Sequence, residues 1–206
     1  MQFTTLASHD KVQIYLLFYK PTATDPFQNR LVAFFNGPYC HVEMAFPELH
    51  GDEPWEKEVW GTSVYQGESI FLKPKTYQRD GYFSFALEVT QAQRIKIKEY
   101  CRQQAEREVM FCKWAMYLSY LPVQLLRREG TFCSKHVSSA LQMGQVEGFH
   151  NVNPNLVTPS SLYRMLLTRS QMPSPIVHVV PSRMSEETQQ SSAHSLLRDI
   201  IVKRSF

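Results

Sequence analysis

The hydrophobic period of the chain changes near residue 90, and this change limits the folds that the chain can adopt. Before it, β-branched and aromatic residues form short apolar runs separated by turn-forming residues, which is typical of β-strands. These runs cover residues 11–20, 30–36, 39–47, 58–67, 69–73 and 80–89. After residue 90, the apolar residues recur with the spacing of helices. Strands that precede helices in this way predict an α+β fold, with a mainly antiparallel sheet packed against helices.

The sequence "TQAQ" at residues 90–93 predicts the start of the first long helix. The side chains of Thr90 and Gln93 can each bond the other's backbone amide, as in a capping box, and roughly 18 residues of helical pattern follow. A short helix and a loop are predicted within residues 111–126. Further helices are predicted from Cys133 and from Thr158, where Thr158 would be the N-cap and Pro159 the first helical residue.

The chain is expected to form one folded domain over residues 1–181, followed by a flexible polar tail at 182–206. A length of 206 residues suits a single core, and a hydrophobic content of 43% is enough to form one. The segment "SPIVHVVP" at 174–181 predicts a last strand. The residues after it contain few apolar side chains, so they are not expected to pack into the core.

Charge and cysteine usage exclude several classes of function. The net charge is only +3, and basic runs in the body of the chain are no longer than two residues, so no nucleic-acid partner is expected. The four cysteines form no CxxC pair, so free thiols are expected and no metal or organic cofactor is implied. The N-terminus has no basic segment leading into an apolar run. A signal peptide is therefore not expected. We expect the protein to be intracellular, in the cytoplasm.

Cys133 in "GTFCSKHVSSALQ" stands where a helix is predicted to begin, and it is the first candidate catalytic residue. The unpaired amides of a helix N-terminus favour a thiolate, and they can also stabilise an oxyanion beside the sulfur. The alternative is a small apolar side chain that fills the core, since Val137 and Ala140 on the same helical face are predicted to be buried.

A nucleophilic cysteine needs a base, and His41 is the histidine best placed to serve as one. It is predicted to lie on a strand, where Glu43 and Ala45 share its face while the apolar side chains of Val42 and Met44 occupy the other. The alternative is an ordinary histidine at a sheet edge. The remaining histidines fall in polar segments, in the Cys133 helix or on the predicted last strand: His9, His50, His136, His150, His178 and His194.

The segment "HVEMAFP", followed by "TFCSKHVSSALQ" and then by "TPSSLYRML", resembles the permuted papain-like amidases and peptidases of the NlpC-type superfamily. That group includes YiiX-like hydrolases, lecithin retinol acyltransferase-like enzymes and proteins of large DNA viruses. In its permuted members the histidine strand precedes the cysteine helix, as His41 precedes Cys133 here. The resemblance covers most of residues 11–168 and implies a circularly permuted papain-like fold.

Carried over by position, the resemblance implies that Cys133 is the nucleophile and His41 the general base. The family usually has a polar residue on the next strand that orients the imidazole, and the matching positions here are Thr62 and Ser63. Either hydroxyl would orient a ring more weakly than a carboxylate. Glu43 is the alternative orienting residue.

These assignments imply a cysteine-dependent hydrolase or acyltransferase that cleaves an amide, peptide or ester bond through a thioester, with backbone amides near residues 133 and 134 holding the oxyanion. Peptide, isopeptide and acyl-lipid substrates are all used by members of this group, and a virus-associated protein is among the expectations. One alternative is an inactive binding or scaffold protein on the same fold. Membrane-surface binding through "LLRDIIVKRSF" is the least favoured alternative, because that segment is short.

Overall fold

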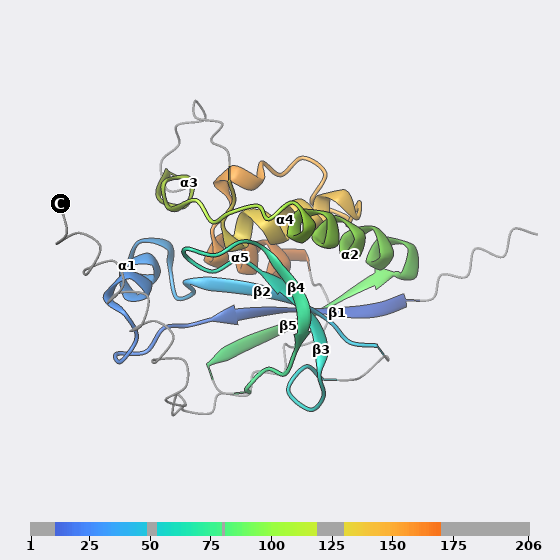
Figure 1. The fold of residues 1–206 in the computed structure, drawn as a ribbon, viewed down its shortest axis with the longest axis horizontal. Helices are drawn as coiled ribbons and strands as arrows, with labels where there is room; N and C mark the ends of the chain where they lie inside the picture. Colours follow the sequence, from blue (N-terminus) through green and yellow to red (C-terminus); the bar gives the residue numbers. More distant parts are fainter. Residues whose placement is uncertain (1–10, 49–52, 80, 119–129, 170–206) are drawn as a thin grey trace, which may run out of the picture.

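A computed structural model describes residues 11–48, 53–79, 81–118 and 130–169, which form an α+β fold around one five-stranded antiparallel sheet (Figure 1). The strand order is β4-β3-β2-β1-β5. The predicted fold class, α+β with an antiparallel sheet packed against helices, is therefore confirmed. The strands are β1 (Lys11–Tyr19), β2 (His41–Phe46), β3 (Val59–Ser63), β4 (Phe71–Lys75) and β5 (Tyr82–Thr90).

The alternating side chains of β1 and β2 divide the sheet into two buried faces. Val42 and Met44 belong to the main hydrophobic core, as the period-two pattern predicted. Ala45 faces the other way, into a smaller cluster that includes Leu17 and Tyr77. His41 and Glu43 alternate with the core residues of β2, so the backbone directs them away from the main core.

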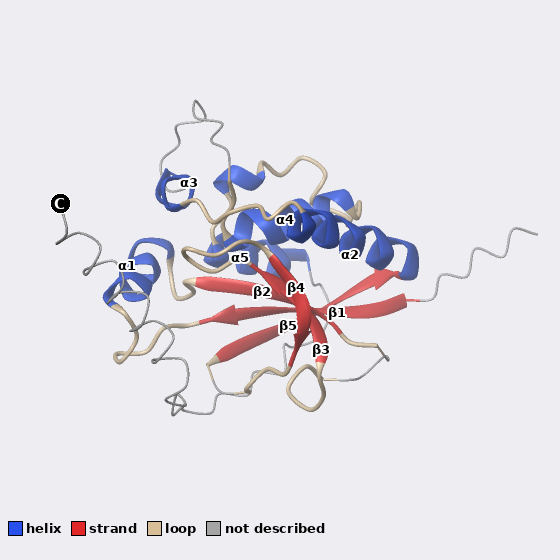
Figure 2. Ribbon diagram, in the orientation of Figure 1, coloured by secondary structure: helices blue, strands red, loops and turns tan. Residues whose placement is uncertain are grey.

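Three helices pack on the face that carries the main core, α2 (Gln91–Glu106), α4 (Cys133–Met143) and α5 (Pro159–Arg169) (Figure 2). Helices α2 and α4 approach closely at Gly144, where a β-carbon would collide with the Ile97 side chain. The 3₁₀ turn η1 (Pro154–Leu156) contacts α4, and the short helix α3 (Lys113–Leu118) comes between α2 and α4 in the chain.

Local sequence signals account for the ends of these helices. Thr90 caps α2 through both bonds of the predicted capping box, with Gln93 N donating to Thr90 Oγ1 at 3.2 Å and Thr90 N donating to Gln93 Oε1 at 2.9 Å. Thr158 accepts from Ser161 N at 3.1 Å before the first turn of α5. The predicted helix starts at Thr90, Cys133 and Thr158 are thus confirmed.

Helix α1 (Phe27–Asn36) corrects the predicted order of strands before helices. It lies between β1 and β2, within a stretch that reads as apolar and aromatic, "RLVAFFN". Val32 is buried, whereas Phe34 and Phe35 are 81% and 67% exposed, so this stretch has the one-sided burial of a surface helix. Pro26 is the N-cap residue of this helix, and its side chain makes no capping hydrogen bond.

Several expectations fall on residues that the structure does not describe. The predicted strand at 174–181, the tail at 182–206 and the "LLRDIIVKRSF" segment all lie in this part of the chain, so they stay predictions. Within the described ranges, no helix has the length and apolar character needed to cross a bilayer.

Candidate active site

Cys133 is the first residue of α4 and lies where the helix meets the sheet. Phe132, its N-cap, has extended backbone angles (φ −144°, ψ 165°), and the first bond within the helix runs from His136 N to Phe132 O at 2.9 Å. The amides of residues 133–135 precede that bond, so they form the positive end of the helix. Cys133 is only 4% exposed.

His41 is the first residue of β2, at a point where β2 pairs with β1 but not with β3. The β1 ladder extends to the pair Tyr19–His41, whereas the β3 ladder ends at Met44–Thr62. The backbone of Val42 is therefore available to side chains. Its carbonyl accepts from Ser63 Oγ at 2.7 Å, and its N–H donates toward the sulfur of Cys133.

The structure brings the side chains of Cys133 and His41 close enough for each to shift the pKa of the other. Burial opposes ionisation of the thiol, but the charge and hydrogen bond of His41, with the amides of Val42 and Ser134, outweigh it and lower the pKa of Cys133. Burial also opposes the imidazolium, yet contact with Cys133 and Glu43 raises the pKa of His41 to about 9. The site thus favours a thiolate beside an imidazolium.

Two acceptors face the Nε2 atom of His41. Ser63 Oγ lies 3.4 Å away and Glu43 Oε1 lies 3.7 Å away. The Ser63 proton is directed at the Val42 carbonyl, so an oxygen lone pair faces the ring and Nε2 carries the hydrogen. Nδ1 is then the ring nitrogen that neither of these two acceptors faces. Both predicted orienting residues, Ser63 and Glu43, therefore lie beside His41.

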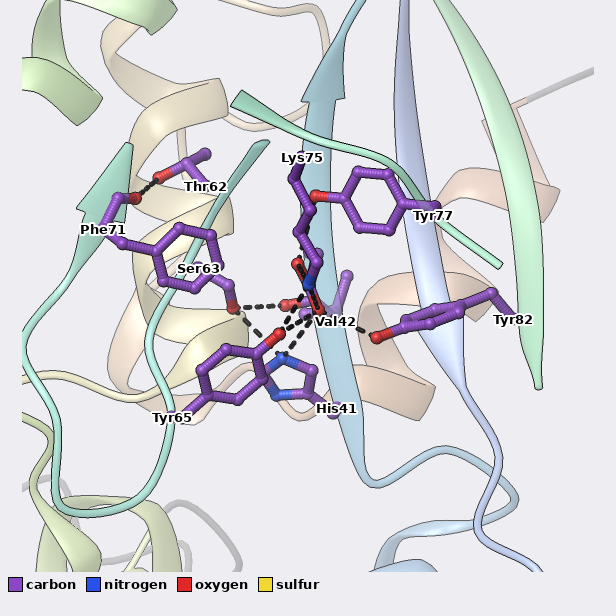
Figure 3. A network of polar contacts seen from close by, with 10 residues as sticks. His41, Val42, Thr62, Ser63, Tyr65, Phe71, Lys75, Tyr77 and Tyr82 are labelled. Carbon is purple, nitrogen blue, oxygen red and sulfur yellow. Dashed lines mark hydrogen bonds and ion pairs between the residues drawn. The ribbon is translucent and has the colours of Figure 1, made fainter. Parts of the chain in front are cut away.

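Glu43 is fully buried and sits in a cage of donors that the sequence analysis missed (Figure 3). Lys75 Nζ binds Oε1 at 2.9 Å and Oε2 at 2.8 Å. The hydroxyls of Tyr65, Tyr77 and Tyr82 donate to the same carboxylate at 2.6, 3.0 and 2.9 Å. Burial would raise the pKa of Glu43, but His41 and Lys75 together hold it well below its usual range.

Gly61 on β3 makes room for one of these donors. A β-carbon at this position would collide with the hydroxyl of Tyr77, which binds Glu43. The register pairs Gly61 with Ala45, on the same face as Glu43. A glycine within a strand marks a place where another group approaches the backbone closely, and it is the sequence signal that hints at the cage. Nothing in the periodicity distinguishes its lysine and tyrosines from ordinary surface residues.

Thr62 contacts His136 and not His41. The prediction that Thr62 could orient the His41 ring is therefore wrong. Its hydroxyl donates to the Phe71 carbonyl at 2.7 Å and lies 2.9 Å from Nε2 of His136. Thr62 points toward the helices because neighbouring strand residues alternate, whereas Ser63 points toward His41. Burial lowers the pKa of His136 to about 4, so this histidine is neutral.

Among the other histidines, His150 is exposed on the loop after α4, while His9, His50, His178 and His194 lie outside the described residues. Among the described residues, no three His, Cys, Asp or Glu side chains gather as metal ligands would. No protein-family model, curated protein or solved structure matches this chain. The assignment of the site therefore depends on its geometry and on the resemblance of its motifs.

His136 should make folding sensitive to acid. Its pKa is about 4 in the folded protein and about 6.5 in an unfolded chain. The unfolded state then binds more protons between these values, so the free energy of unfolding should fall by roughly 2 kcal/mol from about pH 7 to about pH 4.5. In His136→Gln, which keeps a donor toward Thr62, urea denaturation should show a smaller fall. An equal fall in both proteins would contradict this account.

The Cys133–His41 pair should also be visible in thiol reactivity. Near pH 7, Cys133 should react with iodoacetamide faster than half-buried Cys112 does, as read from modified peptides by mass spectrometry. His41→Ala should slow modification of Cys133 by about tenfold, while the helix N-terminus preserves some reactivity. The matched control is His150→Ala, which removes an exposed imidazole. Equal rates in wild type and His41→Ala would show that the pair does not activate the thiol.

Proposed function

We propose that this protein is a cysteine-dependent hydrolase or acyltransferase of circularly permuted papain-like fold. The observation that carries the proposal is the proximity of Cys133, the first residue of a helix, to His41, whose charge lowers the pKa of the thiol. The permuted architecture is supported by element order, because a histidine strand precedes a cysteine helix that packs on the sheet.

The first half-reaction follows from the charges of the pair. The Cys133 thiolate attacks a carbonyl carbon, a carbon–sulfur bond forms, and the carbonyl electron pair moves to oxygen. Backbone amides at residues 133 and 134, at the positive end of α4, stabilise that oxyanion in this proposal. The His41 imidazolium gives its proton to the departing nitrogen or oxygen as the carbonyl re-forms. The products are a thioester on Cys133 and a neutral imidazole.

The second half-reaction needs an acceptor. His41, now neutral, takes a proton from water or from an acceptor hydroxyl or amine, which attacks the thioester carbonyl. Sulfur leaves as the thiolate and restores the ion pair. Ser63 accepts from Nε2–H throughout, and the Glu43 carboxylate lies 3.7 Å from the same nitrogen, so Nδ1 is the ring nitrogen left to transfer the proton. Water gives a hydrolase and another acceptor gives an acyltransferase.

A binding protein on the same fold is the second candidate. The observation that favours it is the low exposure of the pair, 4% for Cys133 and 16% for the His41 side chain. A substrate carbonyl must reach the sulfur, so catalysis requires the surroundings of Cys133 to open. A binding protein has no such requirement.

An acyl-donor screen tests the proposal. Peptide amides, isopeptides and lipid esters should be incubated with the protein, and an acyl adduct cleaved by hydroxylamine should appear on Cys133 with at least one class. Cys133→Ser should abolish turnover and the thioester, whereas Cys112→Ser, which removes another thiol, should retain both. An adduct that persists in Cys133→Ser would overturn the proposal. So would the absence of adducts together with a Cys133 no more reactive than Cys112.

A further inference from the structure

The imidazole of His41 stacks against an aromatic ring that comes from outside the strands. Tyr65, two residues beyond β3, has its ring centroid 5.0 Å from that of His41, and the two planes are inclined by only 22° (Figure 3). Phe71 stacks on Tyr65 in turn, at 5.4 Å and 18°. The orientation of the imidazole is therefore limited by a ring as well as by the acceptors at Nε2.

The hydroxyl end of Tyr65 is fixed at two points. It donates to Glu43 Oε1 at 2.6 Å and accepts from Lys75 Nζ at 2.7 Å. Lys75 is in turn held by both oxygens of Glu43. A ring anchored at its far end by two charged groups cannot swing away from its neighbour without breaking charge-assisted hydrogen bonds.

The same bonds limit how strongly Glu43 can attract His41. The carboxylate receives short hydrogen bonds from Lys75 and from three tyrosine hydroxyls, whereas His41 Nε2 remains 3.7 Å away. A carboxylate without these donors would draw the imidazolium into a short ion pair. The ring would then turn toward Glu43 and away from the sulfur.

We propose that Tyr65 is the positioning residue of His41, and that its anchorage to Glu43 and Lys75 holds the imidazole against Cys133. This inference rests on the proposed function, since it assigns the residue that keeps the reacting pair aligned. Tyr65 reaches sulfur only through His41, so its loss should change the pairing of thiol and imidazole without removing either group.

The test compares Tyr65→Leu, which removes the stacked ring, with Tyr65→Phe, which keeps the ring and loses its anchor. The readouts are the pH dependence of Cys133 modification by iodoacetamide and the titration of His41 by NMR. Tyr65→Leu should slow modification near pH 7 by about tenfold and move the acid limb of the profile to higher pH, because a displaced imidazolium no longer stabilises the thiolate. Tyr65→Phe should fall between wild type and Tyr65→Leu.

Tyr100→Leu is the matched control, because Tyr100 stacks at 6.1 Å and 22° on His136, the other buried histidine. It removes an equivalent ring from the same fold without touching His41, so its profile should follow that of wild type. Thermal unfolding identifies any variant that does not fold. If Tyr65→Leu is unstable, Tyr65→Phe alone decides through its His41 titration, which should differ from wild type.

The outcomes separate this inference from the proposed function. If His41→Ala slows Cys133 modification while folded Tyr65 variants keep the wild-type profile and His41 titration, the positioning inference is wrong and the proposed function stands. If His41→Ala also has no effect, the catalytic pair itself fails. Equal slowing in Tyr65→Leu and Tyr100→Leu would indicate a general loss of packing, and it would overturn the inference.

Discussion

The contact between the Cys133 thiol and the His41 imidazole is the interaction on which the arrangement of this site depends. It forms because β2 begins at His41 but pairs with β3 only from Met44 onward, which leaves the backbone of Val42 open on that side. The start of α4 packs into the opening, and its sulfur meets both the Val42 amide and the imidazole. If β3 paired with β2 as far as Val42, the Val42 amide would bond to β3 and would not be free for the sulfur.

The negative charge that supports this pair is the carboxylate of Glu43, which is buried on the opposite side of the sheet from the main core. Burying a carboxylate such as Glu43 is costly unless donors replace its water, and here Lys75 and three tyrosine hydroxyls do so. Removing one partner leaves the others uncompensated, so the cage is sensitive to substitution. The fold thus holds a fixed negative charge 3.7 Å from His41, where it favours the imidazolium.

The parts of the structure that follow from local sequence were predictable. The strands, the capping box at Thr90 and the helix beginning at Cys133 are set by alternation, by side-chain capping and by short-range spacing. Helix α1 was missed because its aromatic residues resemble a strand, and their exposure depends on tertiary packing. The permuted papain-like topology stays a prediction, because the resemblance that implies it covers short motifs.

The candidate site was predictable only where residue type restricts chemistry. A cysteine at a helix start and a histidine on a strand can be found in this way, and Ser63 and Glu43 followed from strand position. The cage around Glu43 could not be found, because Tyr65, Lys75 and Tyr82 come from separate segments that only the folded sheet brings together. Periodicity carries no information on such long-range contacts.

The most direct test of the central claim is an ultraviolet titration of the thiolate at Cys133. The difference in absorbance between wild type and Cys133→Ser, followed as pH is raised, reports ionisation of that sulfur alone. The account predicts a midpoint below the value of about 8.5 for a free cysteine. A midpoint at or above about 8.5 would contradict it, because a buried thiol without a charged partner ionises late.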